Sequence, residues 1–414
     1  MEPNMKHLTL ALFLCATTGF AQIDVGASIF TQYDANVLGN YEKSPDLVGL
    51  VSLHLGKDFG GDSWTVASSY TGSYTAFRTY ADHDFQLHTL NLSSLFTFGK
   101  KDDEEDEEES RDGLADTTFH LLMVSLKGLG RFDKTTFNLY DHYLGSGTVE
   151  LRYAVGAKSA LRGIYAVIYK NFTNVPEVNN LENNVVLQGM FGIGGSTQLL
   201  VDAGAGYKAY LTTTYDTTKF KQPGKGRGKG KGKGGFMNPQ AAQERIFIAA
   251  VESPSVSQVV FGGGIAQFWR HGSYSFFAAY HRRTNPVNKA RYISQQPSGF
   301  GADEDIYDDR YMYQSHELSG GVHMKLAWDI SADIGGEHVI KTYARPALSL
   351  EGSEIAPQRK DVRSTLEIVL SRDINVGSSS MTIGLGSSYV RNWSNDEYNN
   401  YNGYAISLSI DFSL

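Results

Sequence analysis

The feature that most constrains this chain is a two-residue alternation of apolar with polar or small side chains. The C-terminal segment shows it most clearly, where Tyr404, Ile406, Leu408, Ile410 and Phe412 are separated by Ala, Ser or Asp residues. Successive side chains of a β-strand point to opposite faces, so this segment is predicted to be a strand with one apolar and one polar face.

About sixteen segments share this alternation, and no amphipathic helical pattern separates them. They are predicted at 23–34, 46–57, 63–75, 85–98, 117–127, 147–155, 159–171, 184–193, 196–210, 257–269, 271–283, 312–326, 328–342, 361–371, 378–391 and 401–413. Strands of this length cross a bilayer core when they are tilted. The sequence therefore predicts an all-β protein, a closed antiparallel transmembrane β-barrel of about 16 strands (about 14–18).

The connections between these segments alternate in length along much of the chain. Short connections are predicted at 58–62, 156–158, 194–195, 270 and 372–377, and long ones at 35–45, 128–146, 172–183, 211–256, 284–311, 343–360 and 392–400. Short turns at one end and long loops at the other are typical of outer-membrane barrels. The connection 99–116 is the exception, because it is long yet falls on the short-turn side.

The N-terminal segment 1–21 has the pattern of a signal peptide. Lys6 and His7 precede an apolar stretch, and small residues at Gly19 and Ala21 fit a cleavage site after Ala21. The single cysteine, Cys15, lies within this segment. The predicted mature barrel, 22–414, therefore contains no cysteine and forms no disulfide.

These features resemble those of Gram-negative outer-membrane β-barrels. In detail, Tyr33–Val37 and the stretch from Asn392 to Tyr404 resemble the first and last hairpins of barrels related to the surface lipoprotein assembly modifier. The resemblance implies an outer-membrane location, contact with outer-membrane lipids and insertion by the barrel-assembly machinery. One departure is that Ser413 and Leu414 follow Phe412, whereas such barrels usually end on an aromatic residue. The alternative is a soluble β-sandwich or propeller, although the repeat of about 40 residues expected for a propeller is missing.

An acidic run lies in the connection 99–116, where residues 102–109 are eight consecutive Asp or Glu. One interpretation is a solvated connection that self-repulsion keeps extended. The other is a docking segment for a basic periplasmic partner or for divalent cations.

A basic Gly/Lys loop is predicted at 219–235. Its glycine spacing lacks the pattern of a phosphate-binding loop, so it is interpreted as a flexible polycation. Either it is a solvated outer loop, or it contacts lipopolysaccharide and other polyanions. The candidate contact residues are Lys225, Arg227, Lys229, Lys231 and Lys233.

Charged residues on the polar parity of the strands are candidates for lining the barrel interior. Seven are acidic and five are basic: Glu150, Asp202, Glu317, Asp333, Glu337, Glu367, Asp411, Arg152, Lys208, Lys325, Lys341 and Arg363. A sixteen-stranded barrel is wide enough to hold water. These charges either pair across the wall or line a channel, and their mixed sign predicts no strong ion selectivity.

The sequence gives no support for catalysis or for a bound cofactor. It lacks the nucleophile-elbow and zinc-protease motifs, and nothing orders a partner for His281 or His338. The acidic group 303–309 does not match the calcium-loop spacing, so no metal site is predicted. A net charge of -8 argues against a nucleic-acid partner. The leading prediction is a porin-like channel for passive passage of small solutes. The runner-up is a plugged barrel that serves export, assembly or surface attachment, and an outer-membrane hydrolase ranks third.

Overall fold

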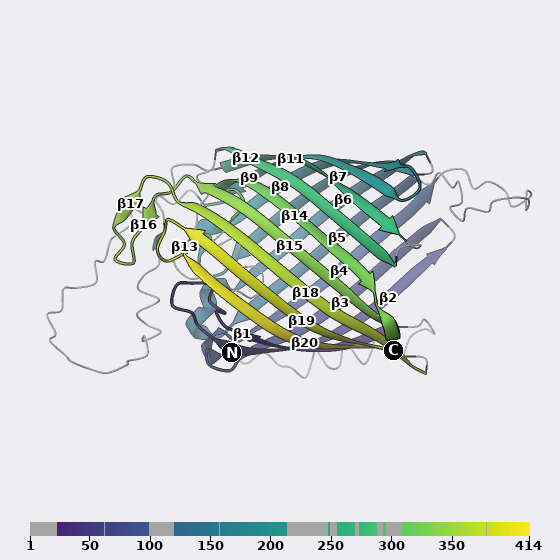
Figure 1. Cartoon of the computed structure of the whole chain (residues 1–414), viewed down its shortest axis with the longest axis horizontal. Helices are drawn as coiled ribbons and strands as arrows, with labels where there is room; N and C mark the ends of the chain where they lie inside the picture. The colour runs from purple at the N-terminus through teal and green to yellow at the C-terminus, as the bar shows by residue number, and fades with distance from the viewer. Residues whose placement is uncertain are drawn as a thin grey trace, which may run out of the picture.

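The computed structural model shows one closed antiparallel barrel (Figure 1). It describes residues 23–61, 63–98, 120–156, 158–212, 247–248, 255–269, 273–287, 293–294, 309–377 and 379–414. Sixteen strands form the wall, and each one pairs with the wall strand before it and the one after it. The barrel closes where β1 pairs with β20, from Gly26 opposite Ser413 to Asp34 opposite Ala405.

The wall strands are mostly 13 to 17 residues long. In chain order they are β1 (Asp24–Asp34), β2 (Asp46–Gly61), β3 (Trp64–Phe77), β4 (Phe85–Phe98), β5 (His120–Asp133), β6 (His142–Gly156), β7 (Ser159–Phe172), β8 (Asn180–Ile193), β9 (Thr197–Tyr210), β11 (Ser255–Trp269), β12 (Tyr274–Val287), β14 (Tyr313–Lys325), β15 (Ile330–Tyr343), β18 (Lys360–Val376), β19 (Ser379–Ser394) and β20 (Tyr401–Ser413). Each predicted segment overlaps one of these strands, so the predicted all-β barrel of about 16 strands is confirmed.

Shorter elements lie in the connections. They are the strand pairs β10 (Phe247–Ile248) with β13 (Ile293–Ser294) and β16 (Ala347–Leu348) with β17 (Glu354–Ala356), and the 3-10 turns η1 (Ala81–His83), η2 (Thr135–Tyr140), η3 (Pro176–Val178) and η5 (Ala327–Asp329). No helix within the described ranges is long and apolar enough to cross a membrane.

Several strands are longer than predicted: β2 runs on to Gly61, β8 already begins at Asn180, and β18 continues to Val376 through most of the predicted turn 372–377. The largest change in a predicted loop concerns β5 and β6. β5 continues to Asp133, and β6 already begins at His142, so much of the predicted loop 128–146 belongs to the wall. The register explains the difference, because Gly128 pairs with Gly145 on the face that carries the apolar side chains. Glycine pairs through its backbone but adds nothing to the alternation of side chains.

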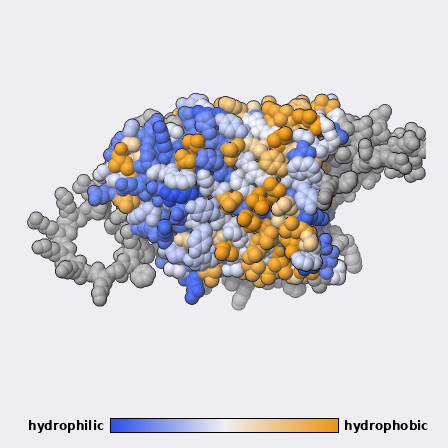
Figure 2. All heavy atoms as spheres, in the orientation of Figure 1, coloured by the Kyte–Doolittle hydropathy of each residue, from blue (hydrophilic) through white to orange (hydrophobic). Residues whose placement is uncertain are grey.

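Apolar side chains cover the outside of the barrel. Residues that lie opposite one another in neighbouring strands share a face, and rows such as Leu385 opposite Leu408 point outward. Leu90 and Leu187 are each 62% exposed. A soluble sandwich would bury such side chains, whereas a barrel in lipid exposes them. Figure 2 shows this apolar surface gathered over the end of the barrel that carries the short turns, while the loop-side half is hydrophilic.

The loop-side rim is packed and ordered. Val37, Val48 and Phe85 belong to one buried apolar cluster, and a second one joins Tyr140 of η2 to Val178 of η3. The signal peptide 1–21, the acidic connection 99–116 and the basic loop 219–235 lie outside the described residues and remain predictions.

Candidate functional site in the barrel interior

The register places all twelve charged candidates on the face opposite to the apolar surface. Glu150 and Arg152, for example, alternate with the outward-facing Val149, Leu151 and Tyr153. The same parity holds for Asp202, Lys208, Glu317, Lys325, Asp333, Glu337, Lys341, Arg363, Glu367 and Asp411.

Exposure of these inward-facing charges changes along the barrel. Arg152, Lys325 and Asp411 lie toward the short-turn end of their strands and are exposed. Lys208 and Lys341 lie toward the loop end and are 1% and 3% exposed. The inward-facing charges are therefore exposed to solvent toward the turn side, whereas those of β9 and β15 near the loop side are buried among other side chains.

Several of the interior charges form ion pairs across neighbouring strands. Glu150 accepts from Arg162 at 2.6 Å, and Glu317 lies 3.3 Å from Arg283 Nε. Glu337 lies 3.6 Å from Arg363 on the next strand. Two further carboxylates contact histidines: Asp333 lies 2.7 Å from His323 on the neighbouring strand, and Asp202 lies 3.1 Å from His281, which is two strands away. Acidic and basic side chains of the interior thus lie next to one another along the wall.

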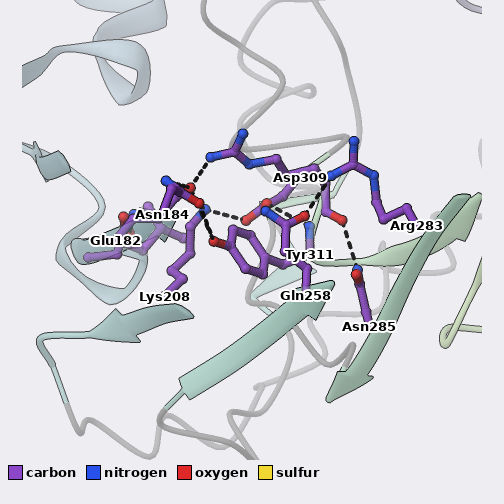
Figure 3. A network of polar contacts seen from close by, with 11 residues as sticks. Glu182, Asn184, Lys208, Gln258, Arg283, Asn285, Asp309 and Tyr311 are labelled. Carbon is purple, nitrogen blue, oxygen red and sulfur yellow. Dashed lines mark hydrogen bonds and ion pairs between the residues drawn. The ribbon is translucent and has the colours of Figure 1, made fainter. Parts of the chain in front are cut away.

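Near the loop-side mouth a segment of chain folds into the interior. Asp309–Met312, here called the latch segment, immediately precedes β14 but contacts β8 and β9 (Figure 3). In the barrel order β12 and β11 lie between β14 and β9. The latch segment therefore spans the inner side of these strands.

An ion pair fixes the start of the latch segment. Lys208 Nζ of β9 donates to Asp309 Oδ2 at 2.6 Å, and both side chains are 1% exposed. Asp309 Oδ1 also accepts from the backbone N–H of Tyr311 at 3.0 Å. The Asp309 carboxylate thus binds both Lys208 of the barrel wall and the backbone of its own turn.

Tyr311 is the centre of the network. Its side chain is fully buried, and its hydroxyl lies 3.1 Å from Glu182 Oε1 and 3.3 Å from Asn184 Oδ1. Arg310 also pairs with Glu182. Burial, reinforced by the nearby Glu182 carboxylate, raises the pKa of Tyr311, so its phenol stays a proton donor.

The β12 side of the latch segment is held through its backbone. Asn285 Nδ2 donates to the carbonyl oxygens of Arg310 at 2.8 Å and Tyr313 at 2.7 Å. Beside it, Arg283 Nη1 donates to Gln258 Oε1 of β11 at 2.6 Å. Asn285 on β12 and Lys208 and Glu182 on β9 and β8 therefore anchor the segment on both sides of the span (Figure 3).

Buried aromatic and apolar side chains pack around the polar contacts. Tyr311 and Met312 form one cluster with Tyr210, Val256, Tyr313 and Tyr343. Lys208 Nζ lies 5.0 Å from the centre of the Tyr311 ring, which adds a cation–π contact to the ion pair.

The two histidines considered for catalysis lie on different faces of the wall. His281 faces the interior beside Asp202, whereas His338 pairs with the outward-facing Leu318 and lies 2.9 Å from Ser364 Oγ. The described residues hold no group of His, Cys, Asp and Glu suited to a metal ion. Asp309, from the acidic group 303–309, pairs with Lys208, and the preceding part of that group is outside the described residues.

Sequence reasoning missed Arg162, Glu182 and Tyr311. β7 carries apolar residues on both faces, as Ile164 and Tyr165 show, so its alternation does not assign a face to Arg162. β8 begins with polar residues on both faces, which hid Glu182 before the predicted strand 184–193. Tyr311 falls in the predicted loop 284–311, where alternation gives no position.

The closed sixteen-stranded wall, its apolar outer surface and its charged interior define a transmembrane β-barrel of the outer-membrane type. No family model and no curated protein sequence matches the chain.

Solved proteins of Pseudomonas aeruginosa, among them the outer membrane protein OpdK, are similar in structure. OpdK has a TM-score of 0.47 and 9% identity, with 96% of this chain and 100% of OpdK covered. OccK10 (OpdN) has a TM-score of 0.46 and 11% identity, with 95% and 99% covered. OccK5 (OpdH) has a TM-score of 0.46 and 10% identity, with 96% and 99% covered. Such values give no residue-level correspondence, so the interior site stands on this chain's own geometry.

Proposed function

We propose that this chain is a porin-like channel of the Gram-negative outer membrane, through which small solutes pass passively. The observation that supports it best is the solvent-exposed charged lining inside a wall that is apolar outside. In a barrel whose interior was filled by side chains, inward-facing charges would be buried, whereas Arg152, Lys325 and Asp411 are exposed. Water and small polar solutes can occupy the space that these side chains face.

The latch segment narrows the loop-side mouth. The contacts described for it lie on strands from β8 to β15, which form one side of the barrel. Solutes would pass along the remaining wall. Because the wall charges meet as ion pairs, the channel is expected to discriminate by size more than by the sign of charge.

The plugged barrel is the second candidate, and the same latch segment favours it. A mouth held by the buried Lys208–Asp309 pair is a plausible closure for a scaffold that exports, assembles or attaches other molecules. Among the described residues, by contrast, no arrangement of side chains supports a catalytic function.

Single-channel recording in a planar bilayer tests the channel and separates it from the plug. The full chain, purified in detergent, is expected to give stable conductance steps without any substitution. A plugged barrel would stay silent until the latch segment is released, for example by Asp309→Ala. Silence of both proteins after verified insertion would contradict the channel.

Contacts made by the charged connections remain proposals of their own. We infer that Lys225, Arg227, Lys229, Lys231 and Lys233 contact external polyanions such as lipopolysaccharide. The acidic run at 102–109 would meet a basic periplasmic partner. The runs of like charge in these two segments support both contacts.

A further inference from the structure

Charge on the wall strands is divided by face. In the described wall strands every Asp and Glu lies on the inward parity. The outward parity carries bases only, and these are Lys57, Arg282, Lys360, Arg372 and Arg391. The outside of the barrel therefore has positive charges and no negative charge of its own strands to neutralise them.

Three of these bases gather at the loop-side ends of neighbouring strands. Arg282 of β12, Lys360 of β18 and Arg391 of β19 each lie within five residues of that end. Two outward-facing histidines, His316 of β14 and His338 of β15, lie on the strands between β12 and β18. His316 is directly opposite Arg282, and His338 is opposite Ser364, which in turn is opposite Arg391. We call these five residues the outer basic patch.

Among the described residues, the side-chain partners of the two arginines in the patch are neutral. Arg282 Nη2 lies 3.5 Å from Gln314 Oε1, and Arg391 Nη2 donates to Asn400 Oδ1 at 3.2 Å. Arg391 also lies 5.2 Å from the Trp393 ring centre. Neutral amides leave the guanidinium charge in place for an anionic ligand.

The height of the patch fits the headgroup region of the loop-side leaflet. A strand of 14 residues is ~46 Å long and rises ~35 Å when tilted by ~40°, whereas the apolar band of such barrels is ~25 Å tall. Figure 2 shows that the apolar surface lies toward the turn side. Tyr280 and Trp393, 44% and 50% exposed, mark an aromatic girdle beside the patch.

We propose that the outer basic patch binds the phosphate groups of lipopolysaccharide in the outer leaflet. Long loops of such barrels face outward, so the loop-side patch meets the phosphorylated glycolipid. Two arginines can each hold a phosphate with two parallel hydrogen bonds, and Lys360 adds a third charge. This proposal rests on the barrel's orientation in the membrane and is independent of channel activity.

Binding of diphosphorylated lipid A to the detergent-purified full chain tests the proposal. Native mass spectrometry is expected to show that a triple variant, Arg282→Gln with Lys360→Gln and Arg391→Gln, binds about tenfold more weakly or worse. Dephosphorylated lipid A should bind weakly to the unsubstituted chain, and added salt should weaken binding of the phosphorylated form.

A matched control comes from the opposite end of the same outer face. Lys57→Gln with Arg372→Gln removes two outward bases at the turn side and should leave lipid A affinity within about twofold. Heat-dependent gel mobility verifies folding of each variant. If the triple variant does not fold, the three single variants replace it, with an expected loss of about threefold each.

Two results would overturn the proposal. One is unchanged affinity of a folded triple variant, and the other is equally tight binding of dephosphorylated lipid A. The comparison is repeated after deletion of residues 221–235, which removes most of the basic loop. The patch effect should persist there, and its disappearance would assign phosphate binding to the loop instead.

Discussion

At the scale of single residues, His83 couples the loop-side rim to pH. It is 6% exposed and stacks on Phe137 with 3.6 Å between ring centres. Burial, together with the charge of Arg131, lowers the pKa of His83 to about 4. As pH falls below about 6.5 the unfolded rim takes up the proton before the folded rim does. The rim should therefore lose stability between pH 6.5 and 4, by at most about 3 kcal/mol.

Hydrogen exchange of η1 and η2 measures this loss. Protection of both turns, measured as the exchange rate relative to the intrinsic rate at each pH, should fall as the pH falls through that window, whereas His83→Phe keeps an apolar ring and should flatten the dependence. An unchanged pH dependence in His83→Phe would show that other groups control the rim.

The two faces of a strand should differ in tolerance to charge. Leu408 points outward near the middle of β20, and Ser407 points inward beside it. Leu408→Arg should cost about 2–4 kcal/mol because it places a cation in lipid. Ser407→Arg should be far milder. Unfolding free energies from urea titration in lipid vesicles make the comparison, and equal losses would contradict the assignment of faces.

At the scale of elements, the latch segment should control the width of the mouth. Asp309→Ala removes the 2.6 Å partner of the buried Lys208, whose other carboxylate neighbour, Glu182, is 3.9 Å away. Loss of a buried partner costs at most about 3–5 kcal/mol in a rigid site. The segment begins outside the wall strands, so it can relieve that cost by leaving the interior. Single-channel conductance should therefore rise in Asp309→Ala.

The matched control for this prediction is Asp333→Asn, an exposed interior carboxylate near the turn-side end of β15. It should change conductance little. Equal changes in the two variants would point to general loss of interior charge instead of release of the latch segment.

What could be predicted from the sequence depended on where a residue stands along its strand. Where a strand crosses the apolar outer surface, the alternation shows which side chains point outward and which point inward. All sixteen strands and the inward position of Asp202 could be predicted in this way. Beyond this surface both faces of a strand are polar, so the start of β8 resembled a loop and Glu182 was missed. Contacts such as Tyr311 to Glu182 join positions 129 residues apart and have no local signal.

At the scale of the whole molecule, the barrel should stay folded in detergent until it is boiled. Every wall strand is hydrogen-bonded on both sides, so sodium dodecyl sulfate meets no free edge from which to unravel the sheet. On gels, unheated protein should migrate faster than boiled protein. Identical mobility, or recovery of the chain as a soluble periplasmic protein, would contradict a closed membrane barrel.

The pairing of β1 with β20 sets the order in which such a molecule can form. The other fifteen wall pairings join strands that follow one another along the chain, and most of them close as hairpins of low loop entropy. The β1–β20 pairing instead brings together Gly26 and Ser413, and it is the shortest ladder of the described wall. Contacts so distant in sequence form late. The β1–β20 pairing should thus form last during folding, and it should be the first strand pairing to separate when the finished barrel opens.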